Sequence, residues 1–142
     1  MSYLLSRMHP ARVLPVLLAI FAIVAGGVAI HADAKTFKGN ARGNTIRGTN
    51  GNDVIYGNGG NDRLYGRGGN DTIYGGGGND RIDAGSGRRG KPIGVLVGGA
   101  GNDTIISRNR VVDIVSCGPG RDTVVADRID RIAGDCETVQ LK

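Results

Sequence analysis

A nine-residue repeat constrains this chain more than any other feature of its sequence. Blocks counted from Gly39 follow the pattern G-x-x-G-N-D-x-(I/L)-Y. Five blocks run without a gap, at residues 39–47, 48–56, 57–65, 66–74 and 75–83, and two more follow at 98–106 and 117–125. Phe37 lies one repeat before Ile46, so residues 35–37 are expected to end a first half-repeat. Such short blocks bury a core only by stacking on their neighbours, which predicts a solenoid.

Each block divides into a turn of six residues and a strand of three. Position 8 is always aliphatic, and its occupants are Ile46, Ile55, Leu64, Ile73, Ile82, Ile105 and Val124. Because alternate residues of a strand point to opposite faces, position 8 is expected to face inward and position 9 outward. The inward row predicts a thin aliphatic core, and the chain has no Trp and only 2 Phe to thicken it.

The turn residues are those that a hard cation needs. Glycine at positions 1 and 4 permits positive φ and leaves carbonyl oxygens free, and asparagine at position 5 tolerates the left-handed region best among other residues. Aspartate at position 6 adds a carboxylate oxygen. Ca²⁺ takes six to eight oxygen ligands at about 2.3–2.6 Å, carbonyl and carboxylate mixed. The alternative is a metal-free solenoid, because Asn, Asp and Gly also favour plain turns.

The repeat resembles the RTX family of hemolysin-type calcium-binding nonapeptide repeats over about residues 37–125. The resemblance implies an all-β, right-handed parallel β-roll in which two repeats form one coil and Ca²⁺ lies between stacked turns. It also implies that Tyr56 and Tyr74 stack on one sheet, while Tyr65 lies on the other. A role in carbohydrate stacking is the alternative to a simple solvent-facing ladder.

A coil of two repeats places each turn on the turn 18 residues away. One edge then carries Asn44, Asp62, Asp80, Asp103 and Asp122, and the other carries Asp53 and Asp71 before Arg89 and Val112 replace the acid. The strongest sites are expected between Asp62 and Asp80 and between Asp53 and Asp71. The pair Asp103 and Asp122 is expected to be weaker, and Asn44 weakest.

The complete set of predicted metal ligands follows from these rows. They are Asp53, Asp62, Asp71, Asp80, Asp103, Asp122 and Asn44, with backbone carbonyls near Gly48, Gly57, Gly59, Gly66, Gly68, Gly75, Gly77 and Gly98. The interval from Asp80 to Asp103 is longer than one coil, so a loop is expected to bulge at residues 86–92, and one extra residue between Asp103 and Asp122 predicts a β-bulge.

Folding is expected to require the ion. The chain has 26 Gly, whose ordering is entropically expensive, and its core is thin. Stacked aspartates at about 4.8 Å also repel one another unless a cation neutralises them. Both effects favour a chain that is loose without Ca²⁺ and folded with it.

The N-terminal segment has the pattern of an export signal. Arg7 and Arg12 precede an uncharged apolar stretch over residues 13–30, and Ala32-Asp33-Ala34 fits a cleavage site. This predicts a Sec-type signal peptide at 1–34 and a secreted protein, extracellular or associated with a cell surface. A retained membrane anchor is the alternative, since the stretch is just long enough to span a bilayer.

The end of the chain differs from the repeats. Cys117 and Cys136 are the only 2 cysteines, and an exported protein with two most simply pairs them. The resemblance implies that a C-G-P-G-x-D…D-C-E ending caps the last coil. We therefore divide the chain into a signal peptide at 1–34, a calcium-binding roll at 35–125 and a cap at 126–142 tied by the disulfide.

Composition narrows the function. Both histidines, His9 and His31, lie in the predicted signal, so the secreted part has no histidine base or ligand, and an enzyme is not expected. The net charge of +5 is unusual for calcium-binding repeats and leaves acidic cell-surface or extracellular polysaccharide as a partner. We expect a monomeric calcium-binding protein with a structural or surface-interaction role, without specific nucleic-acid binding or membrane insertion after cleavage. The alternative is an accessory module that binds anionic polysaccharide through its Tyr and Arg/Lys faces.

Overall fold

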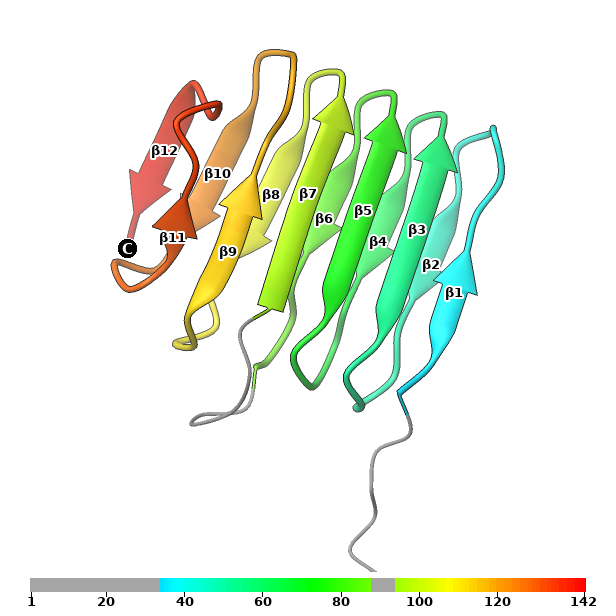
Figure 1. The fold of residues 1–142 in the computed structure, drawn as a ribbon, viewed down its shortest axis with the longest axis horizontal. Helices are drawn as coiled ribbons and strands as arrows, with labels where there is room; N and C mark the ends of the chain where they lie inside the picture. The colour runs from blue at the N-terminus through cyan, green and yellow to red at the C-terminus, as the bar shows by residue number, and fades with distance from the viewer. Residues whose placement is uncertain (1–33, 88–93) are drawn as a thin grey trace, which may run out of the picture. The chain divides into compact units, whose positions relative to one another are not determined.

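The computed structural model describes residues 34–87 and 94–142. Residues 1–33 of the predicted signal peptide and residues 88–92 of the basic loop lie outside these ranges. Within them the chain is all-β, and its strands alternate between two parallel six-stranded sheets (Figure 1). About six coils form a parallel β-solenoid, as the repeat predicts.

The odd-numbered strands form one sheet, which we call the odd sheet. It consists of β1 (Thr36–Lys38), β3 (Val54–Gly59), β5 (Thr72–Gly77), β7 (Gly94–Ala100), β9 (Asp113–Ser116) and β11 (Arg131–Ile132). The even-numbered strands form the even sheet. It consists of β2 (Thr45–Arg47), β4 (Arg63–Tyr65), β6 (Arg81–Asp83), β8 (Thr104–Ser107), β10 (Thr123–Ala126) and β12 (Thr138–Leu141).

Position 8 of each repeat builds the core between the sheets, as predicted. The fully buried members are Ile55, Ile73, Leu96 and Val115 on the odd sheet and Leu64, Ile82, Ile105 and Val124 on the even sheet. Because each inward residue stacks on its counterpart in the next coil, the core is a single file on each sheet. This core is thin, so the turns must contribute to stability.

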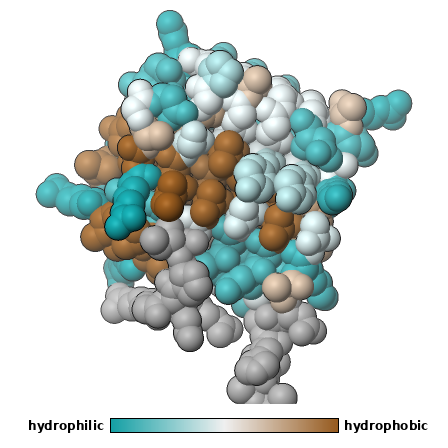
Figure 2. Space-filling model, viewed as in Figure 1, coloured by the Kyte–Doolittle hydropathy of each residue, from teal (hydrophilic) through white to brown (hydrophobic). Residues whose placement is uncertain are grey.

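Position 9 faces outward, and the tyrosines occupy the predicted sheets. Tyr56 and Tyr74 stack on the odd sheet with ring centroids 5.1 Å apart and planes within 7°. On the even sheet the Arg47 guanidinium lies 5.1 Å from the ring centroid of Tyr65. Figure 2 shows the outer face of the odd sheet, where apolar side chains gather over β7 and β9, and Ile114 there is 39% exposed.

The interruption after residue 83 leaves the strand register intact. Thr72 pairs with Val95 and Arg81 with Thr104, so both sheets continue across the longer coil. The extra residues are accommodated in the connection between β6 and β7, as the spacing predicts.

The C-terminal segment adds strands to both sheets. β11 pairs with β9, and β12 pairs with β10. Val139 and Leu141 occupy the inward register of β12 but are 42% and 52% exposed, because no further strand lies beyond them in the described chain. The disulfide between Cys117 and Cys136 ties this coil to the preceding one. No helix among residues 34–87 and 94–142 has the length and apolar character needed to cross a membrane.

Candidate metal centre

Acidic side chains form a row along each edge of the solenoid, where the turns lead into the strands. The row before the even strands, which we call the even row, contains Asn44, Asp62, Asp80, Asp103, Asp122 and Glu137. The row before the odd strands, which we call the odd row, contains Asp53, Asp71, Gly94, Asp113 and Asp130. Stacking of the coils therefore brings the predicted ligands together along two lines.

A hydrogen-bond ladder orders the even row. The backbone N–H of each member donates to one carboxylate oxygen of the next: Asn44 to Asp62 at 2.6 Å, Asp62 to Asp80 at 2.8 Å, Asp80 to Asp103 at 2.8 Å, Asp103 to Asp122 at 2.7 Å and Asp122 to Glu137 at 2.7 Å. The ladder fixes every carboxylate in one orientation. The longer coil does not interrupt it, because the Asp80 N–H reaches Asp103 across the predicted insertion as well.

The second carboxylate oxygen of these aspartates has no partner in the described chain. The Oδ2 atoms of Asp62, Asp80, Asp103 and Asp122 are buried and accept no hydrogen bond, and the Oδ2 of Asp71 on the odd row is in the same state. A buried carboxylate oxygen without a partner is expensive, because it has lost its hydration without compensation. Five such atoms at equivalent turn positions favour a cation as their partner.

The pKa values follow from this environment. The pKa of Asp80 is raised to about 6, mainly by burial; the N–H bond from Asp62 lowers it, and the neighbouring carboxylates of Asp103 and Asp62 contribute to the rise. Burial likewise raises the pKa of Asp71 to about 6 and also raises that of Asp103. In each case the charged form is disfavoured in the absence of a cation.

Glycine at position 1 leaves room beside these oxygens. A Cβ added to Gly57 would lie within 3.0 Å of both Asp62 Oδ2 and the Gly75 carbonyl oxygen of the next coil. The same two kinds of oxygen converge beside Gly75, from Asp80 and Gly98, and beside Gly66 and Gly98. A carboxylate oxygen and a carbonyl oxygen from successive coils therefore line each cradle, as a hard oxygen-seeking cation requires.

The odd row differs, because most of its carboxylates bind the protein's own donors. Asp53 accepts the Thr49 hydroxyl through Oδ2 at 2.9 Å, and Asp113 accepts the Asn109 amide at 2.9 Å. Asp130 accepts the Ser107 hydroxyl at 2.8 Å. We call such turns closed, in contrast to the open turns, in which Oδ2 has no donor. Asp71 is the only member of the odd row with an open turn in the described chain.

Backbone conformation separates the two kinds of turn. In open turns the residue at position 2 has positive φ, 78° at Asn58 and 77° at Arg67. In the closed turn that ends at Asp53, Thr49 is not left-handed, and both its N–H and its hydroxyl bond to Asp53. The first turn closes in the same way, with the Asn40 N–H donating to the Asn44 side chain at 2.7 Å. In both N-terminal turns, the residue at position 2 thus donates a hydrogen bond to the side-chain oxygen at position 6.

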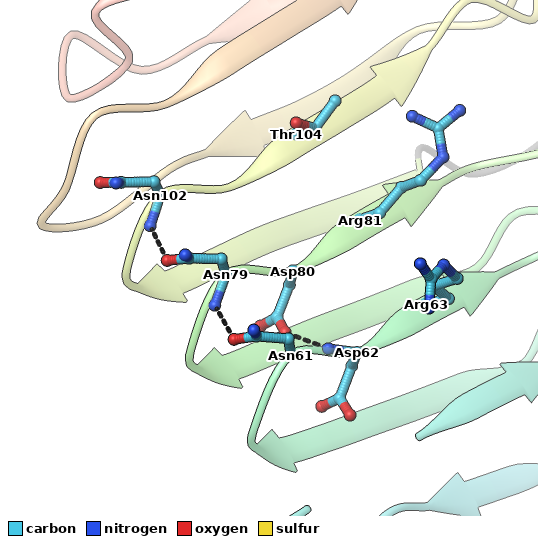
Figure 3. A pocket seen from close by; sticks show the side chains of 8 residues that line it. All are labelled: Asn61, Asp62, Arg63, Asn79, Asp80, Arg81, Asn102 and Thr104. Carbon is cyan, nitrogen blue, oxygen red and sulfur yellow. Dashed lines mark hydrogen bonds between the residues drawn. The ribbon is translucent and has the colours of Figure 1, made fainter. Parts of the chain in front are cut away.

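Two expectations about the turn residues were wrong. Position 1 does not have positive φ, and position 2 has it instead, whereas position 4 is left-handed as expected, for example at Gly60 and Gly78. Asparagine at position 5 is not left-handed either. Its amide oxygen accepts the N–H of position 5 in the next coil, at 2.8 Å from Asn79 to Asn61 and 2.8 Å from Asn102 to Asn79 (Figure 3). Asparagine is suited to this second ladder because its amide oxygen reaches the next coil.

The predicted carbonyl ligands fall into two groups. The carbonyl oxygens at position 1 line the cradle of the preceding coil. They belong to Gly57, Gly66, Gly75 and Gly98. The Gly48 carbonyl instead accepts a hydrogen bond from the Arg67 side chain at 3.5 Å. Gly59 and Gly77, at position 3, pair with each other at the ends of β3 and β5, and the N–H of Gly68 donates to the Thr49 carbonyl at 3.1 Å.

Sequence spacing missed three acidic members of the rows, which are Asp113, Asp130 and Glu137. Gly94 pairs with Asp113, so these residues occupy the odd-row places assigned to Arg89 and Val112. The error at Arg89 arose from carrying the 18-residue step into the inserted loop, and Val112 misses Asp113 by one residue because the coil from Gly94 to Asp113 is longer than the regular one. Asp130 extends the odd row with its Oδ1, which accepts the Asp113 N–H at 2.9 Å. Glu137 follows Asp122 by only 15 residues, and its longer side chain completes the even row.

A separate cluster of Cys117, Asp135 and Cys136 has other chemistry. Its two sulfurs are joined in the disulfide, so neither is a thiolate that could bind a metal. Asp135 accepts hydrogen bonds from the Ser116 hydroxyl at 2.9 Å and the Gly118 N–H at 3.0 Å, and the serine bond is the main cause of its lowered pKa. This carboxylate thus fastens the turn that precedes β10.

Comparison with known families identifies the repeat. The RTX calcium-binding nonapeptide repeat matches in 4 copies, over residues 38–73, 56–89 and 95–108. No curated protein and no solved structure matches the chain. Such repeats are typical of extracellular bacterial proteins and are typically structural.

Proposed function

The chain carries RTX calcium-binding nonapeptide repeats, and on this premise we propose that it is a secreted protein whose folding is driven by Ca²⁺ and whose role is structural or in surface interaction. The observation that carries the proposal is the set of five buried Oδ2 atoms that accept no hydrogen bond from the described residues, at equivalent positions of five turns. No catalytic role is proposed for any residue.

We place the ions along the even row. Asp62, Asp80, Asp103 and Asp122 stack in successive coils, and the Oδ2 of each accepts no hydrogen bond from residues 34–87 and 94–142. Beside Asp62, Asp80 and Asp103, the carbonyl oxygen of position 1 in the following coil adds a second ligand atom, so that the donors are all oxygen. Bound Ca²⁺ supplies the positive charge that lets these carboxylates stay ionised side by side. Asp71 is the corresponding candidate on the odd row.

Two of the predicted ligands become weak candidates. Asp53 already accepts bonds from Thr49, and the side chain of Asn44 is neutral and bonded to its own turn. We therefore propose that the two N-terminal turns fold without an ion and begin the solenoid, and that the open turns require one. This proposal weakens the predicted site between Asp53 and Asp71 and keeps the predicted site between Asp62 and Asp80.

Secretion and processing are part of the same proposal. The signal pattern at 1–34 favours export, and extracellular calcium modules often bind at about 10⁻⁴–10⁻³ M, which keeps such a chain unfolded in calcium-poor cytosol. The disulfide is consistent with an oxidising compartment. We retain 35–125 as the calcium-binding roll and 126–142 as its disulfide-tied end.

The test is a metal titration of the full chain. After the metal is removed with chelator, far-UV circular dichroism is recorded while Ca²⁺ or Mg²⁺ is added. We expect a transition from coil to β-structure with Ca²⁺ alone, because Mg²⁺ demands a smaller octahedral site and keeps its water. A β-spectrum that neither chelator nor Ca²⁺ changes would show that the core and disulfide suffice.

A second candidate function is binding of anionic polysaccharide through the tyrosine and basic faces. The stacked rings of Tyr56 and Tyr74 favour it, with Lys38 Nζ 5.8 Å from the Tyr56 ring centroid. In a second version of this function, the basic loop at 86–92 binds the polysaccharide. Glycan retention that survives substitution of Arg88, Arg89 and Lys91 by Ser would contradict that version.

A further inference from the structure

A pocket of about 320 Å³ lies on the outside of the even row, where β4, β6 and β8 begin. Asn61, Asn79 and Asn102 line one side, and Arg63, Arg81 and Thr104 line the other (Figure 3). Asp62 and Asp80 lie between the two sides. This volume is at the lower end of the range for small-ligand sites.

The asparagine side of the pocket offers oriented donors. Each amide oxygen in the ladder is used by the next coil, so the amide is fixed with its Nδ2 group turned away from that bond. The Nδ2 groups of Asn61, Asn79 and Asn102 donate to no residue that the structure describes. They remain available to acceptors on a ligand.

The arginine side is a pair of unneutralised charges. Arg63 and Arg81 are exposed and directly opposite each other on neighbouring strands. Neither side chain forms an ion pair or hydrogen bond with the part of the chain that is described. Their in-register neighbours on the even sheet are Thr45 and Thr104, which carry no charge. Like charges at this spacing destabilise a sheet, so an anion between them would relieve the repulsion.

From this arrangement we infer that the pocket binds an acidic glycan through a sugar carboxylate. The two planar guanidinium groups suit a carboxylate, which accepts paired N–H donors. The amide groups and the Thr104 hydroxyl suit the neighbouring sugar hydroxyls. None of the described residues that line the pocket is an aromatic platform on which a nucleic-acid base would stack, so a glycan fits better than a single-stranded nucleic acid.

The glycan site rests on the proposed calcium function. Asp62 and Asp80 border the pocket, and without a cation their negative charge opposes an anionic ligand. With Ca²⁺ bound along the even row this opposition is removed, and the two arginines dominate the local field. Glycan binding therefore requires Ca²⁺, although the glycan itself contacts the arginines and amides.

The test uses isothermal titration calorimetry on the full chain, with Ca²⁺ at one saturating concentration in cell and syringe. The probe is tri-galacturonate, a short uronate oligomer. Substituting Arg63→Ser and Arg81→Ser together should weaken binding about tenfold or more, because two charge-assisted contacts are lost. The matched control, Arg128→Ser with Arg131→Ser, removes the same charge from exposed positions outside the pocket and should change affinity less than about twofold.

Each other outcome contradicts the inference in a defined way. Equal losses in both double variants would mean that only the overall charge attracts the probe. A sulfated dextran oligomer or an oligonucleotide that binds as tightly as tri-galacturonate at the same pocket would exclude a carboxylate-specific site. Calcium-induced dichroism is recorded on the same samples. If the native protein shows the calcium transition but no probe binding, the glycan site alone is wrong; if it shows no transition, the calcium function is wrong.

Discussion

Gly75 and Gly77 lie two residues apart in the same turn, and neither has positive φ. A Cβ on Gly75 would enter the cradle within 3.0 Å of Asp80 Oδ2 and the Gly98 carbonyl oxygen, whereas a Cβ on Gly77 would meet nothing within 4 Å. We expect Gly75→Ala to raise the Ca²⁺ midpoint about tenfold or abolish folding, because the methyl group occupies the space beside both oxygens. Gly77→Ala is the matched control.

Calcium titrations followed by circular dichroism compare these two variants. Gly77→Ala should keep the native midpoint and gain slightly in stability, since alanine restricts the unfolded chain. Equal behaviour of the two variants would mean that the cradle beside position 1 has no part in ion binding.

The aspartates also differ from one another, although the repeat makes them look equivalent. Asp80→Asn removes a charge from an open turn and should raise the Ca²⁺ midpoint about tenfold. Asp53→Asn removes a charge that Thr49 already satisfies. It should lower stability by about 1 kcal/mol while changing the Ca²⁺ midpoint less than about twofold. A larger shift for Asp53→Asn would place the ions on the odd row instead.

Sequence predicts the acidic ligands but does not distinguish open turns from closed ones. Both kinds contain aspartate at position 6, and the difference depends on the φ angle and hydrogen bonding of position 2. Asn40 and Asn58 both occupy this position, yet Asn40 closes its turn and Asn58 adopts φ of 78° and donates to the Gly39 carbonyl at 2.8 Å. Residue type alone therefore does not determine the conformation.

At the scale of the element, the repeat predicts strands well because its apolar period is strict. Every aliphatic residue at position 8 is on a strand, and the half-repeat at Phe37 forms β1 as expected. The last coil is harder to predict, because its strands follow neither the period nor the turn pattern. Glu137 belongs to the even row although it follows Asp122 by 15 residues, and this spacing does not fit the repeat.

The disulfide stabilises this last coil. It joins the turn before β10 to the residue two positions before β12, over a sequence separation of 19. Substituting Cys117→Ala and Cys136→Ala together should cost about 3 kcal/mol of unfolding free energy, as expected for a loop of this length. Urea denaturation at saturating Ca²⁺ measures the loss. Unchanged stability would show that β11 and β12 hold to the solenoid through strand pairing alone.

At the scale of the whole molecule, the raised pKa values reverse the usual effect of acid on folding stability: acid should stabilise the metal-free fold. Asp71, Asp80 and Asp113 each have a folded-state pKa of about 6, above the ordinary value of 3.8. Between these values the folded chain binds more protons than the unfolded chain, so metal-free stability should rise as pH falls from about 7 to about 4. Circular dichroism in chelator, followed against pH, should show β-structure increasing.

Calcium should invert this dependence, because protons and the ion compete for the same carboxylates. The Ca²⁺ midpoint is therefore expected to rise as pH falls through about 6. Metal-free protein that loses β-structure on mild acidification would contradict the assignment of Asp71 and Asp80 as buried carboxylates whose Oδ2 atoms have no partner in the described chain.

The unbroken register across the connection between β6 and β7 also has a consequence for how such a protein can change over evolution. The Asp80 N–H meets Asp103 at 2.8 Å across 23 residues, with the same geometry that Asp62 and Asp80 have across 18. Each coil depends only on the coils beside it, so this connection can vary in length while the ladders on both sides stay aligned. New sequence can therefore be introduced at this point, and a new specificity acquired, without rebuilding the scaffold.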